Sequence, residues 1–186
     1  LKTGNPFLDF SVDVGPVIDE AARDKIRTHI ERMKAVQHPY AAAPLADKVE
    51  QEGVYVAPHL FEIASIAELK QEVFGPVLHV IRYKADELAS VCDMINTTGY
   101  GLTAGLESRI EQNIALVRQR IRAGNLYINR SMIGATVGVQ PFGGEGMSGT
   151  GPKAGGPHYL QRFLTERTLS VNTAAIGGNL GLLSGS

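Results

Sequence analysis

The middle of the chain alternates between strand-like and helix-like residue patterns, and this alternation constrains the fold more than any other feature. Extended apolar stretches predict strands at 78–83, 102–106 and 125–129, and helical spacing of apolar residues predicts helices at 86–96 and 107–122. Successive strands connected by helices over short loops are typical of parallel sheets. The sequence therefore predicts an α/β fold in which helices cover a parallel sheet.

Three further segments have clear patterns. An apolar stripe predicts a helix from the N-cap Asp19 to about Val36, and residues 53–58 resemble a short strand. Residues 164–173 alternate threonine with aliphatic side chains, which predicts an extended strand, whereas the tail 174–186 has no clear pattern. The residues of the helical stripe are Ala22, Ile26, Ile30 and Met33.

Ten of the 21 glycines fall between Gly124 and Gly156. The strand predicted at 125–129 leads into this segment, and open α/β sheets build ligand sites at the carboxyl ends of their strands. Glycine costs roughly 0.5–1 kcal/mol relative to alanine in regular elements, so this density favours a backbone surface that approaches a ligand. We interpret the segment as a substrate-binding loop, with a mobile surface loop as the alternative. Apolar residues that are costly to leave in water favour the first interpretation: Met132, Ile133, Val137, Val139 and Phe142.

Composition narrows the class of protein. The 186 residues are 44% hydrophobic, which is enough for one domain with a sizeable core. The formal net charge is -1, and no run of lysine or arginine marks a nucleic-acid or membrane surface. The single cysteine leaves no internal disulfide, and neither a signal peptide nor an apolar run near the roughly 20 residues of a membrane span is visible. We expect a cytoplasmic protein that either acts on a small molecule or takes part in protein assembly. Because it begins at Leu1, we also expect a piece of something longer.

The cysteine and the histidines of the sequence provide no clear candidate for a catalytic nucleophile or a metal ligand. Cys92 lies on the apolar face of the helix predicted at 86–96, where burial keeps a thiol inert, so we interpret it as a core residue and not as a nucleophile. The five histidines form no spacing that metal sites use, and no metal site is predicted. A serine elbow and a phosphate-binding P-loop are likewise missing from the sequence.

Two short motifs have a chemical interpretation. In EVFGPV, the Glu72 carboxylate could accept both hydroxyls of a ribose diol while Phe74 limits the sliding of a flat ring, although a buried turn with a capping glutamate explains the motif equally well. The residues from Gly134 to Gly138 carry successive unhindered amides, which suits an anion such as a carboxylate. A simple chain reversal remains the alternative there.

Several motifs, in order, resemble the C-terminal half of the aldehyde dehydrogenase superfamily: EVFGPV, INTTGYGLTAGLESR, GNLYINR and PFGGEGMSGTG. The longer run NRSMIGATVGVQPFGGEGMSGTGPKAGGPHYL, with DVGPVID before it and TLSVNT after it, is similar to one branch. This branch comprises the L-glutamate γ-semialdehyde (1-pyrroline-5-carboxylate) dehydrogenases, as found in the bacterial bifunctional proline utilisation family, PutA. The resemblance extends from Asp13 through Thr173.

The resemblance implies roles for five residues. Glu72 would bind the nicotinamide ribose hydroxyls of NAD, and Phe74 would lie beside the nicotinamide. The backbone amides of Gly134 and Ala135 would hold the substrate carboxylate, and Phe142 would pack against the aliphatic chain of the aldehyde.

The resemblance also implies a division of the chain and a set of partners. Residues 1–163 would be the C-terminal part of an incomplete catalytic domain, 164–173 an oligomerisation strand and 174–186 a tail. The family's catalytic cysteine, its catalytic glutamate and most of the NAD-binding domain would lie upstream of Leu1, so no catalytic residue is expected in this chain. A homo-oligomer is expected, and FAD is expected only in a separate proline dehydrogenase domain outside this chain.

The leading hypothesis is therefore a fragment of an NAD-dependent enzyme that oxidises glutamate γ-semialdehyde to glutamate in proline catabolism, inactive in isolation. Two alternatives stay open. One is a non-catalytic, aldehyde-dehydrogenase-like structural module of a larger bifunctional protein. The other is an aldehyde dehydrogenase of other specificity. The predicted carboxylate site at the amides of Gly134 and Ala135 argues against it, because a neutral aldehyde would form no charge-assisted hydrogen bonds there.

Overall fold

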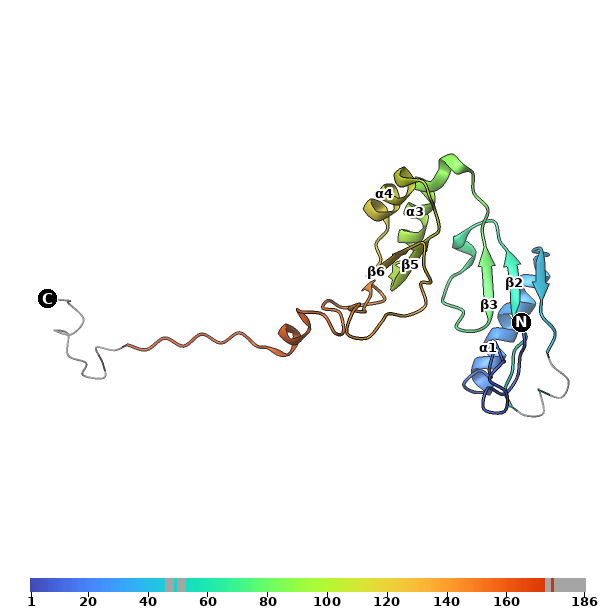
Figure 1. The fold of residues 1–186 in the computed structure, drawn as a ribbon, viewed down its shortest axis with the longest axis horizontal. Helices are drawn as coiled ribbons and strands as arrows, with labels where there is room; N and C mark the ends of the chain where they lie inside the picture. The colour runs from blue at the N-terminus through green and yellow to red at the C-terminus, as the bar shows by residue number, and fades with distance from the viewer. Residues whose placement is uncertain (46–48, 50–52, 173–174, 176–186) are drawn as a thin grey trace.

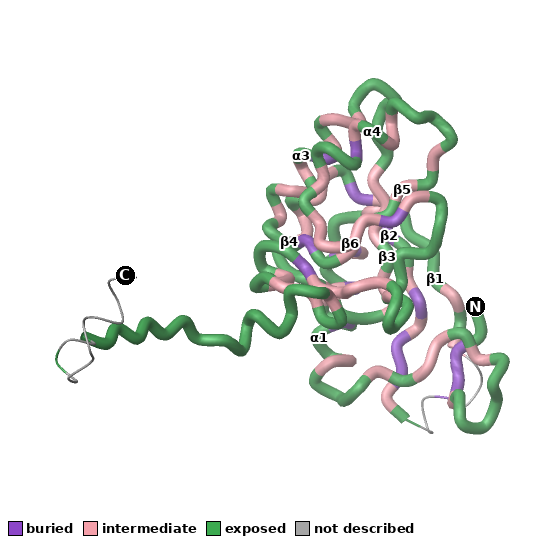
Figure 2. Tube along the Cα trace, turned by 60° about the vertical axis from the view of Figure 1, so that its left-hand side comes forward, coloured by how far each residue is buried: buried purple, intermediate pink, exposed green. Residues whose placement is uncertain are grey.

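The computed structural model describes residues 1–45, 49, 53–172 and 175. Its helices and strands form two lobes, and residues 164–172 run away from both as an exposed extension (Figures 1 and 2). The first lobe contains α1 (Glu20–Ala35), β1 (Tyr40–Ala42), β2 (His59–Glu62), η1 (Ile66–Glu68) and β3 (Val77–Val80). The second contains η2 (Ala85–Glu87), α3 (Leu88–Thr97), β4 (Tyr100–Gly101), β5 (Thr103–Leu106), α4 (Glu111–Arg120), β6 (Asn125–Ile128) and β7 (Glu145–Gly146), followed by η3 (Tyr159–Phe163).

The packing of α1 against β2 and β3 forms the core of the first lobe. Asp19 caps the helix, since its Oδ1 accepts a hydrogen bond of 2.7 Å from the Ala22 amide. The predicted helix and its apolar stripe are confirmed, because three of the four stripe residues are buried. The core cluster consists of Ile26, Ile30, Met33, Val56, Phe61 and Ile63.

Parallel pairing, which the alternating pattern predicted, is present twice. β2 pairs with β3 from His59 opposite Val77, and β5 pairs with β6 from Thr103 opposite Asn125. These pairs belong to two separate sheets, and antiparallel partners add to the fold: β1 joins β2, and β4 joins β7. The α/β class is confirmed, with its parallel strands divided between the two lobes.

The strand predicted at 53–58 is wrong. The structure begins a strand only at His59, and Tyr55 and Val56 are buried without ladder pairing. Val54 contributes one backbone bond, in which its carbonyl accepts from the Val17 amide at 2.8 Å. The apolar pattern of residues 53–58 therefore indicated that their side chains are buried, and side chains of a loop can be buried as well as those of a strand.

The helix predicted at 107–122 begins four residues late, at Glu111. Ser108 and Asn129 exchange two hydrogen bonds, from the Ser108 amide to Asn129 Oδ1 at 2.8 Å and from Asn129 Nδ2 to the Ser108 carbonyl at 2.9 Å. These bonds hold the turn before the helix in a non-helical conformation. The second lobe buries Cys92, Val117 and Tyr127.

Residues 164–172 are exposed and carry no strand assignment in the part of the chain that the structure describes. A strand is defined by a pairing partner, and an element that lies across another subunit has none in a single chain. The oligomerisation strand at 164–173 therefore stays a prediction, and all of the tail 174–186 except residue 175 lies outside the described residues. Within the described ranges, no helix is both long and apolar enough to cross a membrane.

Candidate functional site

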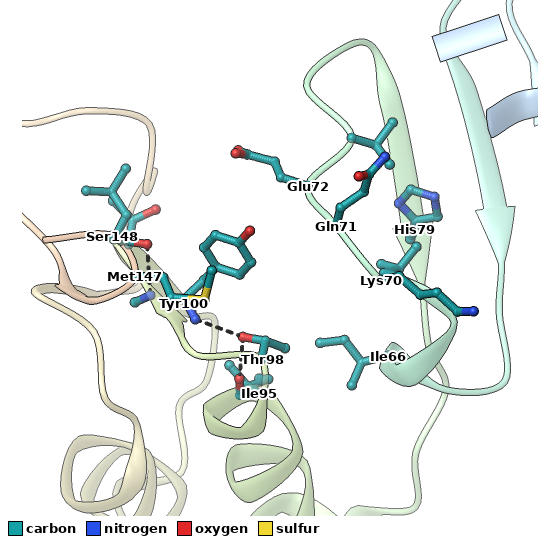
Figure 3. A pocket seen from close by; sticks show the side chains of 15 residues that line it. Ile66, Lys70, Gln71, Glu72, His79, Ile95, Thr98, Tyr100, Met147 and Ser148 are labelled. Carbon is teal, nitrogen blue, oxygen red and sulfur yellow. Dashed lines mark hydrogen bonds between the residues drawn. The ribbon is translucent and has the colours of Figure 1, made fainter. Parts of the chain in front are cut away.

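A cavity of about 660 Å³ lies where the two lobes face each other, beside β3 and β5 (Figure 3). Its lining comes from two stretches of the first lobe and from the β4–β7 region of the second. The polar residues and aromatics of the lining are Lys70, Gln71, Glu72, His79, Thr98, Tyr100, Thr103 and Ser148.

Glu72 is exposed and projects into the space that faces Tyr100 (Figure 3). Among the described residues, no side chain or backbone group forms a hydrogen bond or an ion pair with its carboxylate. The alternative of a buried capping glutamate is therefore wrong, and both oxygens are available to hydroxyl donors. The turn after it packs closely on α1 at Gly75, where a Cβ would lie 2.4 Å from the Cδ1 atom of Ile26. Phe74 is 84% exposed and does not line the cavity.

The opposite wall of the cavity is built by backbone pairing that the sequence did not reveal. Tyr100 on β4 pairs with Gly146 on β7, and the Met147 amide donates to the Gly99 carbonyl at 2.9 Å. The Ser148 hydroxyl accepts from the Gly101 amide at 3.1 Å. The glycines at positions 99 and 101 allow the close approach of β7.

Residues 134–142, which contain the predicted carboxylate site and are called the anchor loop below, follow β6 and turn around Thr136. The Thr136 carbonyl accepts from the amides of Val139 at 3.1 Å and Gln140 at 2.9 Å. Gly134 has a left-handed φ of 71°, and a Cβ at this position would meet nothing within 4 Å. In the described part of the chain, the amides of Gly134 and Ala135 donate to no acceptor. Two neighbouring N–H groups are thus free to bind an anion.

Phe142 is half-buried at the far end of this loop. Its amide donates to the Ala154 carbonyl at 3.0 Å, and its carbonyl accepts from the Ala154 amide at 2.9 Å. Neither Phe142 nor the anchor glycine and alanine line the 660 Å³ cavity. Of the five residues with predicted roles, Glu72 alone lines this cavity, and the roles of all five stay predictions.

Cys92 is 2% exposed, and burial raises the pKa of its thiol. The interpretation of a core cysteine is confirmed, and this thiol is not an accessible nucleophile.

One pair of histidines makes a contact that sequence reasoning missed. His29 Nε2 on α1 lies 2.9 Å from His79 Nε2 on β3, and Arg32 contacts the other nitrogen of His29 at 3.1 Å. Burial, and secondarily the charges of His79 and Arg32, lowers the pKa of His29 from 6.5 to about 4. The pKa of His79 is lowered as well, chiefly by burial. No group of three or more potential metal ligands is present within the described ranges.

The sequence profile of the aldehyde dehydrogenase family matches residues 1–169. The chain belongs to the aldehyde dehydrogenase family. Among its relatives, the bifunctional protein PutA of Rhizobium meliloti is 56% identical over 156 residues, which cover 84% of this chain and 13% of the relative. The 1-pyrroline-5-carboxylate dehydrogenase of Bacillus subtilis is 39% identical over 172 residues, which cover 91% of this chain and 32% of the relative.

Solved structures of this aldehyde dehydrogenase group share the fold. A crystal structure of a mutant of Bradyrhizobium japonicum proline utilization A superposes with a TM-score of 0.82 at 52% identity, over 94% of this chain and 17% of that one. A mutant 1-pyrroline-5-carboxylate dehydrogenase from Thermus thermophilus gives 0.75 at 38% identity, over 89% and 31% of the two chains. The chain thus spans well under half the length of these relatives.

Proposed function

We propose that this chain is the substrate-anchoring part of an NAD-dependent L-glutamate γ-semialdehyde (1-pyrroline-5-carboxylate) dehydrogenase, which oxidises its substrate to glutamate in proline catabolism. The observation that carries the proposal is the pair of amides at Gly134 and Ala135, which donate to no acceptor among the described residues, in a chain whose relatives are named PutA and 1-pyrroline-5-carboxylate dehydrogenase. A carboxylate accepts from both amides, and charge-assisted bonds of this kind contribute roughly 1.5–3 kcal/mol each. Phe142 supplies an apolar wall for the methylene chain between the two ends of the substrate.

Glu72 and Phe74 suit NAD. The Glu72 carboxylate has no partner among the described residues and can accept two ribose hydroxyls, while the exposed ring of Phe74 borders a flat heterocycle. Glu72 and Phe74 would hold the nicotinamide end of NAD, which would supply the hydride acceptor for the oxidation. This chain's contribution is to orient the ribose and to hold the carboxylate end of the aldehyde.

In the longer protein, FAD would belong to a separate proline dehydrogenase domain outside this chain. Residues 164–173 would contact another subunit of a homo-oligomer, where the threonine and aliphatic side chains could pair as an edge strand.

Turnover of the full-length protein tests the proposal. Glutamate γ-semialdehyde should be oxidised with a far higher kcat/KM than a neutral aldehyde of the same carbon chain, because only the former uses the two amides. Gly134→Leu should raise KM for the semialdehyde at least about tenfold, since a side chain would crowd the anion site. Gly155→Leu is the matched control, since Gly155 has the same φ of 71° and equally open surroundings.

Equal use of acidic and neutral aldehydes would point to an enzyme of other specificity. An unchanged KM in Gly134→Leu would favour a structural module. The isolated chain should form no NADH, because its one thiol, Cys92, is buried. Turnover by the isolated chain would contradict the proposal that this chain binds the substrate but does not supply the nucleophile.

A further inference from the structure

One face of β6 touches both ends of the predicted anchor loop. Asn125 and Tyr127 are two residues apart on this strand, so their side chains leave the same face. Asn125 is half-buried and Tyr127 is 5% exposed. Neither residue was singled out by the sequence pattern, which marked them only as part of a strand.

Asn125 holds the backbone on both sides of Phe142. Its Nδ2 donates to the Pro141 carbonyl at 3.0 Å, and its Oδ1 accepts from the Gly143 amide at 3.2 Å. A carbonyl oxygen can only accept and an amide N–H can only donate, so these partners fix the orientation of the side-chain amide. The position of the Phe142 ring is thereby tied to β6, with Lys153 adding a bond of 2.8 Å from its Nζ to the Gly143 carbonyl.

Tyr127 holds the other end of the loop. Its hydroxyl donates to the Gly134 carbonyl at 2.9 Å, and the Arg130 guanidinium lies 4.8 Å from the centre of its ring. The Gly134 carbonyl shares a peptide unit with the Ala135 amide, and in a trans peptide these two groups point in opposite directions. The bond from Tyr127 therefore turns the Ala135 N–H away from β6 and toward the ligand side of the loop.

We propose that Asn125 and Tyr127 are positioning residues, which set the distance between the carboxylate anchor at Gly134 and Ala135 and the aromatic wall at Phe142. The inference rests on the proposed function and deepens it. Because both contacts start from one rigid strand, the separation of the two subsites is fixed by β6 and not by the glycines between them. A fixed separation favours acidic aldehydes whose methylene chain reaches Phe142 while the carboxylate is held by the anchor, so a shorter chain loses contact with the ring.

The anchor contact is tested by Tyr127→Phe in the full-length protein, which removes one oxygen and keeps the ring. KM for glutamate γ-semialdehyde and the Kd for glutamate, measured by calorimetry, should both rise roughly 3- to 10-fold, the range of one hydrogen bond. The kcat and the kinetics of a neutral aldehyde should change less than about twofold. Tyr55→Phe is the control, because Tyr55 is 2% exposed and lies outside the loop.

The wall contact is tested by Asn125→Asp, which loses the donor to Pro141 and keeps the acceptor for Gly143. The preference for glutamate γ-semialdehyde over the aldehyde one methylene shorter should fall roughly 3- to 10-fold. Asn96→Asp is the matched control, since Asn96 forms a similar two-point clamp at the end of α4: its Nδ2 donates to the Arg120 carbonyl at 2.8 Å, and its Oδ1 accepts from the Arg122 amide at 2.9 Å.

The outcomes separate the two proposals. If the unmodified protein shows no preference for the acidic aldehyde and does not bind glutamate, the proposed function fails. If it shows both, and Tyr127→Phe and Asn125→Asp each leave the substrate ratios and the glutamate Kd unchanged, the positioning role alone is overturned. A uniform loss of kcat with every aldehyde would also overturn it, because that result indicates a merely structural role.

Discussion

The α1–β2–β3 core and the glycine-rich segment after β6 are held together by different forces. In the core, apolar side chains are packed from a helix and two parallel strands, and Phe61 has no exposed surface. In the glycine-rich segment, Val137 is 96% exposed, and the backbone is held by hydrogen bonds to its own carbonyls and to side chains of β6. Packing stabilises the first region, whereas polar clamps set the geometry of the second.

The largest effect should follow from emptying the core. Phe61→Ala should lower the free energy of unfolding of the full-length protein by about 3–5 kcal/mol, because a fully buried ring is replaced by a cavity. Leu78→Ala on the adjacent β3 should cost far less, since Leu78 is 58% exposed. Denaturant titration measures both, and equal costs would contradict a packed core around α1.

The next largest loss of stability should follow when a glycine is replaced by alanine at a point where two backbone segments of the glycine-rich region lie in contact. A Cβ at Gly124 would lie 1.8 Å from the Gly143 carbonyl, so Gly124→Ala should destabilise by about 1–3 kcal/mol. Gly155→Ala meets no atom within 4 Å and should cost only the strain of its positive φ, about 1 kcal/mol. Thermal unfolding of both variants sharpens the comparison, and the reverse order would refute the close approach.

Acidification should loosen the contact between α1 and β3 through the histidine pair. The pKa of His29 is about 4 in the folded chain and 6.5 when unperturbed, so the unfolded state binds more protons between these values. Its contribution to stability is present above pH 6.5 and is lost as the pH falls toward 4, and the lowered pKa of His79 acts in the same direction. After solvent screening we expect a loss on the order of 1 kcal/mol.

The double variant His29→Gln/His79→Gln should flatten the pH dependence of stability in this window, and exposed His158→Gln should leave it unchanged. A similar slope in the double variant would show that other groups titrate there. The Glu68 carboxyl, whose pKa is lowered below 4.5, loses its contribution only at still lower pH.

The smallest effect is expected on the exposed part of the anchor loop. Val137→Ala should change the free energy of unfolding by less than about 0.5 kcal/mol, because the side chain buries almost nothing. A cost above about 1 kcal/mol in the full-length protein would show that Val137 is covered by another part of the molecule.

The same contrast explains what could be predicted from the sequence. The helix α1, its cap at Asp19 and the individual strands β5 and β6 follow from local residue patterns, because the residues that decide each element lie within or next to it. The β4–β7 pairing, the contact between His29 and His79 and the late start of α4 depend on partners 20 or more residues away. Local pattern carries no information on such contacts.

The candidate site divides in the same way. The motif of Glu72 marked a polar group at a turn, and the structure places it at a cavity whose other wall, at Tyr100 and Ser148, was not foreseen. The glycines of the anchor loop were visible in the sequence, whereas the side chains that orient them, Asn125 and Tyr127, resembled ordinary strand residues.

The central claim is that main-chain amides of the anchor loop bind the substrate carboxylate. A crystal structure of the full-length protein with glutamate tests it most directly. The account predicts a carboxylate of the ligand within hydrogen-bond distance of the Gly134 and Ala135 nitrogens, with its methylenes against Phe142. Glutamate bound elsewhere, with both amides still unpartnered, would contradict it.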